Sequence, residues 1–328
     1  MADQEAPIRM TGLRAYWETR SHRVPFAPCL DRSERLLLDT LGLGLEQTLA
    51  YLGGQPDYET FLNWIVETAG IPDPPVLARY EATLAGAPLP GAVQDQIAAI
   101  DAMPPVLDTA DIAQWERDGF VILRNAITPG EVAAAAALIW EANGALPDAP
   151  ESWYGAARNQ GMMVQLFQHP ALEPARRSAR IHKAYAQLWG SSDLWMIIDR
   201  VSFNPPERPS HPFRAPRLHW DVSLVRPIPF AALGVLYLSD TAEDQGAFEL
   251  VPGFHHRLDA WLDGLAGADP RAVDLSAEAV RVPANAGDLI IWRHDLPHGA
   301  SPNRAAAPRL AQYVTMYAPG LTHQAEWL

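Results

Sequence analysis

Three side chains of metal-binding types form an informative pattern in this chain. His219 and Asp221 are two residues apart, and His298 follows much later in the sequence. Two imidazoles and one carboxylate on one face of a metal leave the opposite coordination positions open, which is typical of non-haem iron(II) oxygenases. Because side chains alternate along a strand, a strand over residues 218–224 would point His219 and Asp221 to one face and Trp220 to the other. The pattern predicts a metal site formed by His219, Asp221 and His298.

The second histidine ligand has an alternative nearby. His294 lies shortly before His298 and could bind the metal in its place. We favour His298 because it precedes Gly299 and a polar loop, where the ring has room to turn inward.

An arginine near the end of the chain could hold an acidic co-substrate. Arg309 begins a predicted strand, and in an antiparallel sheet that strand can return beside the one that leads to His298. A guanidinium keeps its charge and pairs with a carboxylate through two parallel hydrogen bonds, a geometry that lysine does not match. Arg304 is the alternative, although its polar loop favours a solvated charge. Candidate hydrogen-bond partners of the same co-substrate are Ser301, Asn303 and Tyr237.

The composition restricts the class of protein. Hydrophobic residues make up 48% and charged residues 20% of the sequence, as in soluble globular proteins. The formal net charge of -14 disfavours a nucleic-acid-binding surface, since phosphate neutralisation needs clustered lysine and arginine. Lys183 is the single lysine, so the cations are almost all arginine. Cys29 is the sole cysteine, so no intramolecular disulfide can form, and the longest apolar run, residues 230–238, is too short to span a bilayer. With no signal-peptide pattern at the start, we expect a cytoplasmic protein that contacts neither nucleic acid nor membrane.

Residues 1–105 are predicted to form an N-terminal helical region. Apolar residues recur at helical spacing over residues 33–52 and again over residues 57–69, with a further turn or two over residues 76–84. The proline-rich residues 103–105 are a candidate linker. Residues 106–328 would then form a second domain.

The second domain is predicted to begin with helices around one strand. Asp108 or Thr109 can cap a short helix through Arg117, and a strand follows Gly119 over residues 120–123. Residues 128–131 (TPGE) have the form of a capping box with proline at the first helical position, which predicts a helix to about residue 143.

From about residue 194 the pattern changes to short β-rich segments. Turn-forming residues separate predicted strands over residues 195–203, 218–224, 230–239, 247–251, 280–282, 288–292 and 310–317. Several strands at such spacing favour an antiparallel sandwich or barrel, and a jelly roll is one way to close it. We therefore expect a mainly β fold with flanking helices.

Several motifs together resemble the phytanoyl-CoA dioxygenase family of Fe(II)- and 2-oxoglutarate-dependent oxygenases. They are residues 219–221 (HWD), 246–255 (GAFELVPGFH) and 296–299 (LPHG), followed by Arg309. Residues 118–123 (DGFVIL) and 128–131 (TPGE) also resemble the family's opening strand and helix, so the resemblance covers roughly residues 108–320. The order and spacing of these motifs together make the resemblance fairly specific.

The resemblance implies a fold and a chemistry. It implies a double-stranded β-helix (a cupin-like jelly roll) in which His219, Asp221 and His298 hold Fe(II) and Arg309 holds the distal carboxylate of 2-oxoglutarate. With O2 as the oxidant, such a dioxygenase would act on an unactivated C–H bond of a small organic substrate, most simply as a hydroxylase in secondary metabolism, releasing succinate and CO2. Related halogenases have a small residue in place of the ligand carboxylate, so Asp221 disfavours halogenation.

Two other interpretations stay open. A cupin-like isomerase or hydrolase that uses another metal would keep the three ligands without needing Arg309. A non-catalytic jelly roll would hold a ligand without turnover. These alternatives differ in whether 2-oxoglutarate is converted to succinate.

The sequence also suggests candidate partners. The proline-rich loop over residues 204–217 contains Arg208, Arg214 and Arg217 and leads to His219, so it could attract an anionic group on a small-molecule substrate. The N-terminal helices could cover the barrel, form a homodimer or contact a carrier protein.

Overall fold

The computed structural model describes residues 8–23, 32–155, 159–214, 218–322, 324 and 326–328. Cys29 and Arg217, both used in the sequence interpretation, lie outside the described residues. Six helices of the N-terminal region are described: α1 (Leu13–Arg20), α2 (Arg32–Thr40), α3 (Leu45–Leu52), α4 (Tyr58–Ala69), α5 (Pro74–Ala85) and α6 (Gly91–Ala102).

The remaining elements combine helices with short strands. They are α7 (Thr109–Asp118), β1 (Phe120–Leu123), α8 (Pro129–Asn143), β2 (Asn159–Gln160), β3 (Met163–Val164), α9 (Glu173–Arg176), α10 (Ala179–Trp189), β4 (Trp195–Met196), β5 (Val201–Asn204), β6 (Ala232–Tyr237), β7 (Phe248–Leu250), α11 (Leu258–Gly264), β8 (Val280–Val282), β9 (Leu289–Arg293), β10 (His298–Ala300), β11 (Arg309–Tyr313) and β12 (Met316–Tyr317). The 3-10 turns are Pro150–Tyr154, Pro170–Leu172, Phe254–His256, Pro270–Ala272 and Ser276–Glu278. Helices hold more of the described residues than strands do, so the fold is mixed rather than mainly β.

The predicted single helix over residues 33–52 is wrong, because the chain breaks between α2 and α3. Gly42 has a φ of +71°, in the left-handed region that favours glycine. Gly44 then begins α3 in an extended conformation, and a Cβ atom there would lie only 2.2 Å from the ring of Phe167. The two glycines thus let the chain turn and pass close to Phe167.

The capping signals at the start of the second region are confirmed. The Asp108 carboxylate accepts hydrogen bonds from the first turn of α7, and Gly119 ends that helix with a φ of 77°. The Thr128 hydroxyl and the Glu131 carboxylate form the reciprocal capping box of α8, with Pro129 at the first helical position. These caps fix where α7 ends before β1 and where α8 begins after it.

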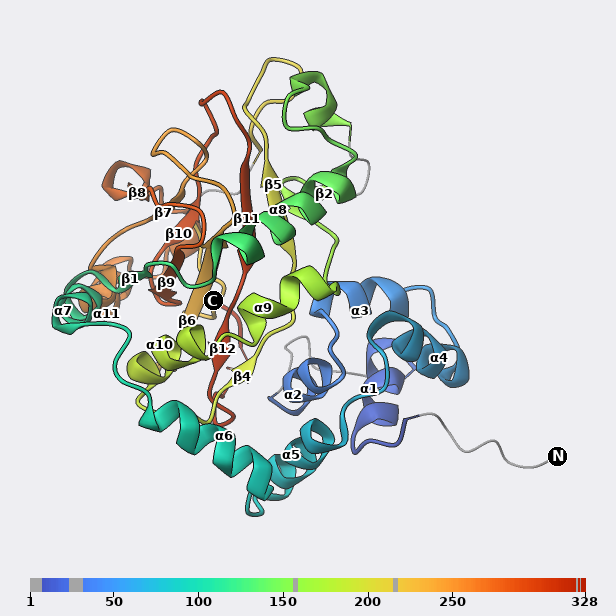
Figure 1. Ribbon diagram of the computed structural model, residues 1–328. Coiled ribbons are helices and arrows are strands. Elements are labelled where there is room, and N and C mark those ends of the chain that lie inside the picture. Colours follow the sequence, from blue (N-terminus) through green and yellow to red (C-terminus); the bar gives the residue numbers. More distant parts are fainter. Residues whose placement is uncertain (1–7, 24–31, 156–158, 215–217, 323, 325) are drawn as a thin grey trace.

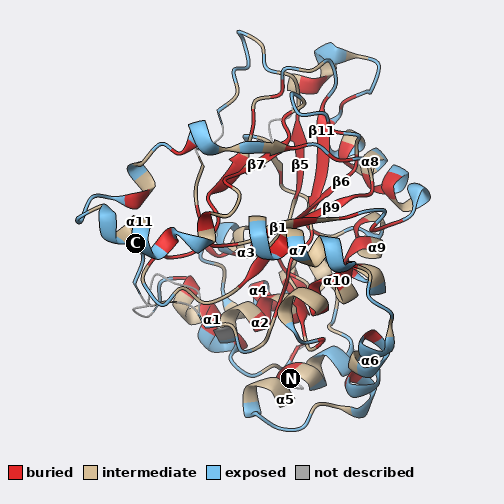
Figure 2. Ribbon diagram, turned by 90° about the vertical axis from the view of Figure 1, so that its left-hand side faces the viewer, coloured by how far each residue is buried: buried red, intermediate tan, exposed pale blue. Residues whose placement is uncertain are grey.

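The strands form antiparallel sheets. A seven-stranded sheet has the order β1-β9-β6-β11-β5-β3-β2, a three-stranded sheet has the order β10-β7-β8, and β12 pairs with β4. Figure 1 shows α8, α9 and α10 in front of the larger sheet, with β7, β8 and β10 to one side of it. Figure 2 shows that the strands of the larger sheet are largely buried, whereas the helices expose their outer faces.

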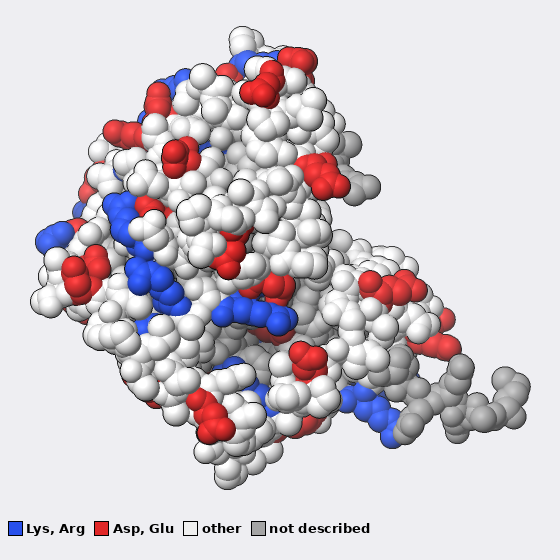
Figure 3. Space-filling view, viewed as in Figure 1, with Lys and Arg blue, Asp and Glu red and all other residues white. Residues whose placement is uncertain are grey.

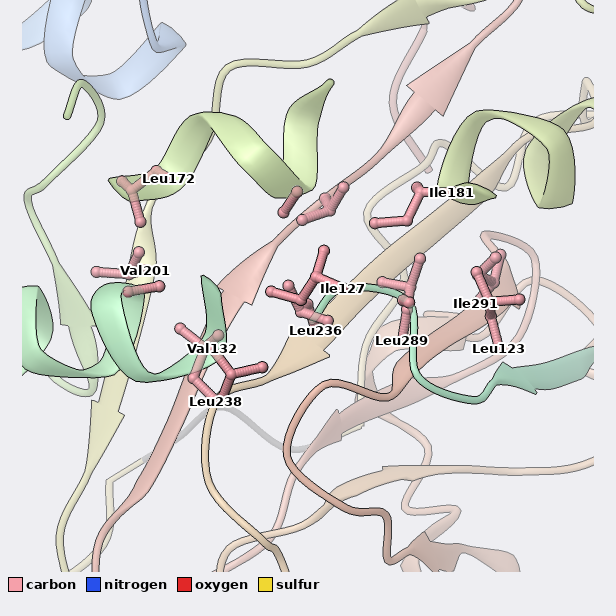
Figure 4. Close-up of a cluster of buried hydrophobic side chains, with 14 of the residues drawn as sticks. Leu123, Ile127, Val132, Leu172, Ile181, Val201, Leu236, Leu238, Leu289 and Ile291 are labelled. Atoms are coloured by element: carbon pink, nitrogen blue, oxygen red, sulfur yellow. The ribbon is translucent and has the colours of Figure 1, made fainter. Parts of the chain in front are cut away.

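The two faces of the larger sheet bury different clusters. On the helix side, Leu236, Leu289 and Ile291 pack with helical residues such as Ile181 (Figure 4). Side chains at the alternate strand positions, including Tyr237, Ile290 and Trp292, pack instead with Phe248 and Leu250 of the smaller sheet. Because successive strand residues point to opposite faces, one strand serves both clusters.

The N-terminal helices have a third apolar cluster of their own. It includes Leu36 and Phe61 and also takes in Trp195 of β4 and Tyr317 of β12. The helices therefore pack on the two-stranded sheet.

The lengths of the helices and the charges on the surface bear on contacts with a membrane or a charged partner. Among the described residues, no helix has both the length and the apolar composition of a membrane span. Acidic side chains are spread over the face shown in Figure 3 and do not gather into one patch.

Candidate metal centre

The structure brings His219, Asp221 and His298 together. One ligand atom from each of the three residues lies within 4.8 Å of the others. The Asp221 carboxylate lies 3.4 Å from Nε2 of His219 and 3.2 Å from Nε2 of His298. The predicted meeting of two imidazoles and one carboxylate is therefore present in the fold.

Backbone pairing brings the two histidines side by side. His219 and His298 form an isolated antiparallel bridge in which each backbone N–H donates to the other's carbonyl, at 2.9 and 3.0 Å. The prediction of a regular strand over residues 218–224 is wrong, because this bridge is the one strand-like pairing within that range. The expected alternation still holds locally: Trp220 is buried against Phe254 and Trp261, while His219 and Asp221 face the other way.

The ring of His298 is fixed by its surroundings. Its Nδ1 lies 3.0 Å from the carbonyl oxygen of Leu296, which accepts a hydrogen bond when Nδ1 carries the proton. In that tautomer Nε2, which faces Asp221, keeps its lone pair for a metal. The ring also packs against Trp292 and Phe248, at centroid distances of 5.1 and 5.9 Å. The sequence alone did not connect these two aromatic residues with the site. The contact with Trp292 of β9 crosses between the sheets, and the contact with Phe248 depends on the pairing of β7 with β10.

Exposure differs among the three residues. The His298 side chain is 5% exposed, whereas those of His219 and Asp221 are 37% and 56% exposed. The cluster therefore has a buried side, formed by His298, and an open side. Partial burial raises the pKa of Asp221. Hydrogen bonds from His219 and His298, made when their Nε2 atoms carry protons, outweigh it and hold the pKa below its ordinary value. The carboxylate is thus ionised and ready to bind a cation.

The alternative ligand His294 lies apart from this cluster. Its ring is buried and contacts the carbonyl of Pro229, and burial lowers its pKa. It is not among the three grouped residues. The geometry thus favours His298 over His294 as the second imidazole.

Arg309 is a buried cation without a carboxylate partner among the described residues. The residue is 1% exposed, its Nε has no hydrogen-bond partner, and its Nη2 lies 3.0 Å from the sulfur of Met162. Burying a charge without a counter-charge is costly, so binding of an anion beside this guanidinium would be favourable. By contrast, the Arg304 side chain is 62% exposed and pairs with Glu207, as its loop position predicted.

The expectation that the strand of Arg309 lies beside the one that leads to His298 is wrong, because β6 lies between β9 and β11. Arg309 is connected with β10 through β5 instead. Arg309 lies opposite Asn204 in the β11–β5 pair, and the Asn204 amide contacts the carbonyl of Ser301, just beyond β10, at 3.5 Å. Gly246 permits this approach, because a Cβ there would lie 2.2 Å from the Asn204 amide nitrogen. Arg309 also shares a sheet face with Tyr237, which lies opposite Ala311 in the β11–β6 pair.

The other three predicted co-substrate contacts already have partners in the protein. The Tyr237 hydroxyl donates to Val282 and accepts from Phe248, and burial raises the pKa of Tyr237 to about 12. The Ser301 hydroxyl donates to the carbonyl of Ala247. The Asn303 amide donates to the carbonyls of Asn204 and Ala307. Contacts from these residues to a co-substrate stay predictions.

A large groove lies elsewhere in the molecule. A cavity of about 1200 Å³ is bordered by Asp39, Gln168 and Arg177, where the N-terminal helices meet α9. None of the three clustered residues borders it. Its size therefore does not mark the candidate centre.

Comparisons with known proteins agree with the motifs. The family model for phytanoyl-CoA dioxygenase (PhyH) matches residues 115–311. A Dictyostelium discoideum protein named "Putative phytanoyl-CoA dioxygenase" is 20% identical over 257 residues, which cover 62% of this chain and 73% of the relative.

Solved structures give weaker likenesses. AviO1 from Streptomyces viridochromogenes Tue57 has a TM-score of 0.47 at 19% identity, covering 68% of this chain and 100% of that one. EctD from S. alaskensis, solved with 2-oxoglutarate and 5-hydroxyectoine, has a TM-score of 0.46 at 20% identity, covering 66% and 81%. These scores are too low to carry an argument, so the assignment depends on the family model, which spans more than half of the sequence. The chain belongs to the phytanoyl-CoA dioxygenase family of Fe(II)/2-oxoglutarate-dependent oxygenases.

Proposed function

We propose that this protein is a dioxygenase that oxidises, most simply hydroxylates, an unactivated C–H bond of a small organic substrate. The observation that carries the proposal is the meeting of His219, Asp221 and His298, whose ligand atoms lie within 4.8 Å of one another. Two imidazoles and one carboxylate are the ligand set of non-haem iron(II) oxygenases. We further propose that the two larger sheets are the halves of a jelly roll.

The residues present fit both iron(II) and 2-oxoglutarate. Nε2 of His298 is free to bind a cation when Nδ1 donates to Leu296, and Asp221 is ionised. Arg309 offers a buried guanidinium whose Nε lacks a partner, which suits the distal carboxylate of 2-oxoglutarate. When bound, iron(II) and 2-oxoglutarate together supply the oxidising power for C–H cleavage, with O2 consumed and succinate and CO2 released.

The chain's own residues orient and shield this chemistry. His298 is fixed by Trp292 and Phe248 on the buried side of the centre, so substrate has to approach from the open side of His219 and Asp221. Arg309 lies on the inter-sheet face with Tyr237, so it would hold the co-substrate against the larger sheet. Orientation by such groups contributes much of the rate in enzymes of this kind.

An anionic group on the substrate fits the loop that leads to His219. The guanidinium of Arg208 lies 3.3 Å from the centre of the Tyr154 ring, and the Tyr154 hydroxyl donates to the carbonyl of Pro206. The neighbouring Glu207 pairs with Arg304. Arg208 is held against the ring of Tyr154 and keeps its positive charge. We propose this loop as the part that attracts the substrate.

The decisive experiment uses the anaerobic protein loaded with Fe(II). Addition of 2-oxoglutarate should produce a visible charge-transfer band, and O2 should then convert 2-oxoglutarate to succinate. His219→Ala should abolish both signals. A cupin-like isomerase or hydrolase would show no such band, and a non-catalytic jelly roll would release no succinate.

A second experiment addresses the reaction itself. Screening small organic acids for faster succinate release, followed by product analysis, would distinguish hydroxylation from other outcomes.

A further inference from the structure

An arginine from a distant part of the chain holds the segment that carries His219 and Asp221. Arg271 lies in the short turn Pro270–Ala272. Its Nη1 donates to the carbonyl of Trp220 at 2.8 Å, and its Nη2 donates to the carbonyl of Val222 at 2.6 Å. One guanidinium therefore binds the two carbonyls on either side of Asp221.

This contact takes the place of a missing strand. On one edge, the backbone of His219 pairs with His298. The chain bends at residues 221 and 222, yet the carbonyls of Trp220 and Val222 both face Arg271, whereas the carbonyl of His219 faces His298 of β10. In a sheet, a neighbouring strand would supply N–H donors there. Arg271 supplies two donors from one planar side chain, which a guanidinium can do and an ammonium cannot do in the same fixed geometry.

The last described residues continue the same edge. Arg271 also donates to the carbonyl of Leu328, through Nε at 3.0 Å and Nη2 at 2.7 Å. The Gln324 amide donates to the carbonyls of Ser223 and Val225, at 3.1 and 2.7 Å. Residues 220–225 are thus held from outside by side chains.

We propose that Arg271 is a positioning residue for the metal centre, which fixes the backbone on both sides of Asp221 so that its carboxylate faces the two histidines. This inference rests on the proposed function, because it takes Asp221 as a metal ligand. Nothing in the spacing of the sequence indicated Arg271, since the contact joins two segments about fifty residues apart.

The charge of Arg271 and its hydrogen bonds have opposite effects on metal binding. Burial lowers the pKa of Arg271, while the carboxylates of Asp269 and Asp221 oppose that shift, so the cation lies near enough to Asp221 to interact with it. A nearby cation repels a metal ion, so removing the charge alone should tighten metal binding. Loss of the two carbonyl contacts should weaken it. The direction of the change therefore distinguishes the two effects.

The test is a titration of the full chain with Co(II), in which the visible absorption of the bound ion reports binding. Arg271→Gln should raise the apparent Kd about 10- to 100-fold, the range found when groups that orient metal ligands are removed. It should also change the Co(II) band shape. Arg271→Lys keeps the charge but cannot bind both carbonyls with the same geometry, so its affinity should be lower than that of the unchanged protein by a smaller factor.

A matched control is Arg226→Gln. Arg226 lies close by in sequence but pairs with the exposed Asp263, so its loss should leave Co(II) binding unchanged. Wild-type affinity, or tighter binding, in Arg271→Gln would overturn the inference. If Arg271→Gln fails to fold, unchanged affinity and band shape in Arg271→Lys would overturn it as well. Failure of the proposed function looks different: the unchanged protein would then bind no Co(II) and give no charge-transfer band with Fe(II) and 2-oxoglutarate.

Discussion

The carboxylate of Asp39 accepts a hydrogen bond from the hydroxyl of Tyr317 at 2.8 Å, which joins helix α2 to strand β12. The same carboxylate receives two hydrogen bonds from Arg35 and one from the backbone N–H of Ile198. Its side chain is 1% exposed. One buried carboxylate therefore ties the N-terminal helices to the strands.

Replacement of Asp39 should destabilise the protein strongly. Asp39→Ala leaves the Arg35 guanidinium, 11% exposed at its side chain, without its counter-charge. Breaking a buried pair in this way costs about 3–5 kcal/mol. Tyr317→Phe removes one hydrogen bond and should cost about 1 kcal/mol. Urea unfolding, monitored by tryptophan fluorescence, measures the free energy of unfolding of both variants.

The control is a second i,i+4 pair in the same region. Arg14 and Glu18 are 3.9 Å apart with side chains 63% and 40% exposed, so Glu18→Ala should change the free energy of unfolding little. Equal losses for Asp39→Ala and Glu18→Ala would contradict the role given to burial.

Arg309 should control the affinity for 2-oxoglutarate. Arg309→Gln removes the buried guanidinium and should raise the KM for 2-oxoglutarate at least about 100-fold, since hydrogen bonds between charged groups contribute about 1.5–3 kcal/mol each. The KM of Arg309→Lys should lie between that of the unchanged protein and that of Arg309→Gln, because lysine keeps the charge but not the bidentate geometry. Arg304→Gln, at the exposed alternative position, should leave the KM near that of the unchanged protein. Succinate release at varied 2-oxoglutarate provides the measurement, and a larger effect at Arg304 would reverse the assignment.

His298 and His294 should differ in metal binding. His298→Ala removes a member of the metal cluster and should abolish tight Fe(II) binding and turnover. His294→Ala removes a buried ring that contacts Pro229 and should lower stability while the protein still binds metal. The metal content after gel filtration and the melting temperature, measured for both variants, distinguish loss of a ligand from loss of stability. Full metal content in His298→Ala would show that the ligand is another residue.

Metal affinity should fall as the pH drops below about 6, because imidazoles bind metals only in the neutral form and histidine generally gains its proton near pH 6.5. Asp221 should not contribute to this loss. Hydrogen bonds with His219 and His298 hold its pKa below the ordinary value despite partial burial, so the ionised form persists until the pH falls well below that range. A Co(II) titration at several pH values between about 5 and 8 checks this expectation. An affinity that stays constant over that range would exclude histidine ligands.

Local signals in the sequence determined a large part of the fold. The caps at Asp108 and Thr128, with Gly119 and Gly144 beyond the helix ends, fixed α7 and α8, because capping depends on residues a few positions apart. Residues 280–282 form β8 as predicted. The spacing of His219 and Asp221 predicted a shared face on the basis of a strand, and the two side chains do converge although that regular strand does not form.

Only the tertiary structure decided the relationships between distant segments. The pairing of His219 with His298, the burial of Arg309 without a carboxylate partner among the described residues, and the contact of Arg271 with the carbonyls beside Asp221 all join residues far apart in the chain. The same holds for the close approach of Gly44 to Phe167 at the break between α2 and α3. Spacing along the chain cannot express such contacts, because they depend on how strands and helices pack in three dimensions.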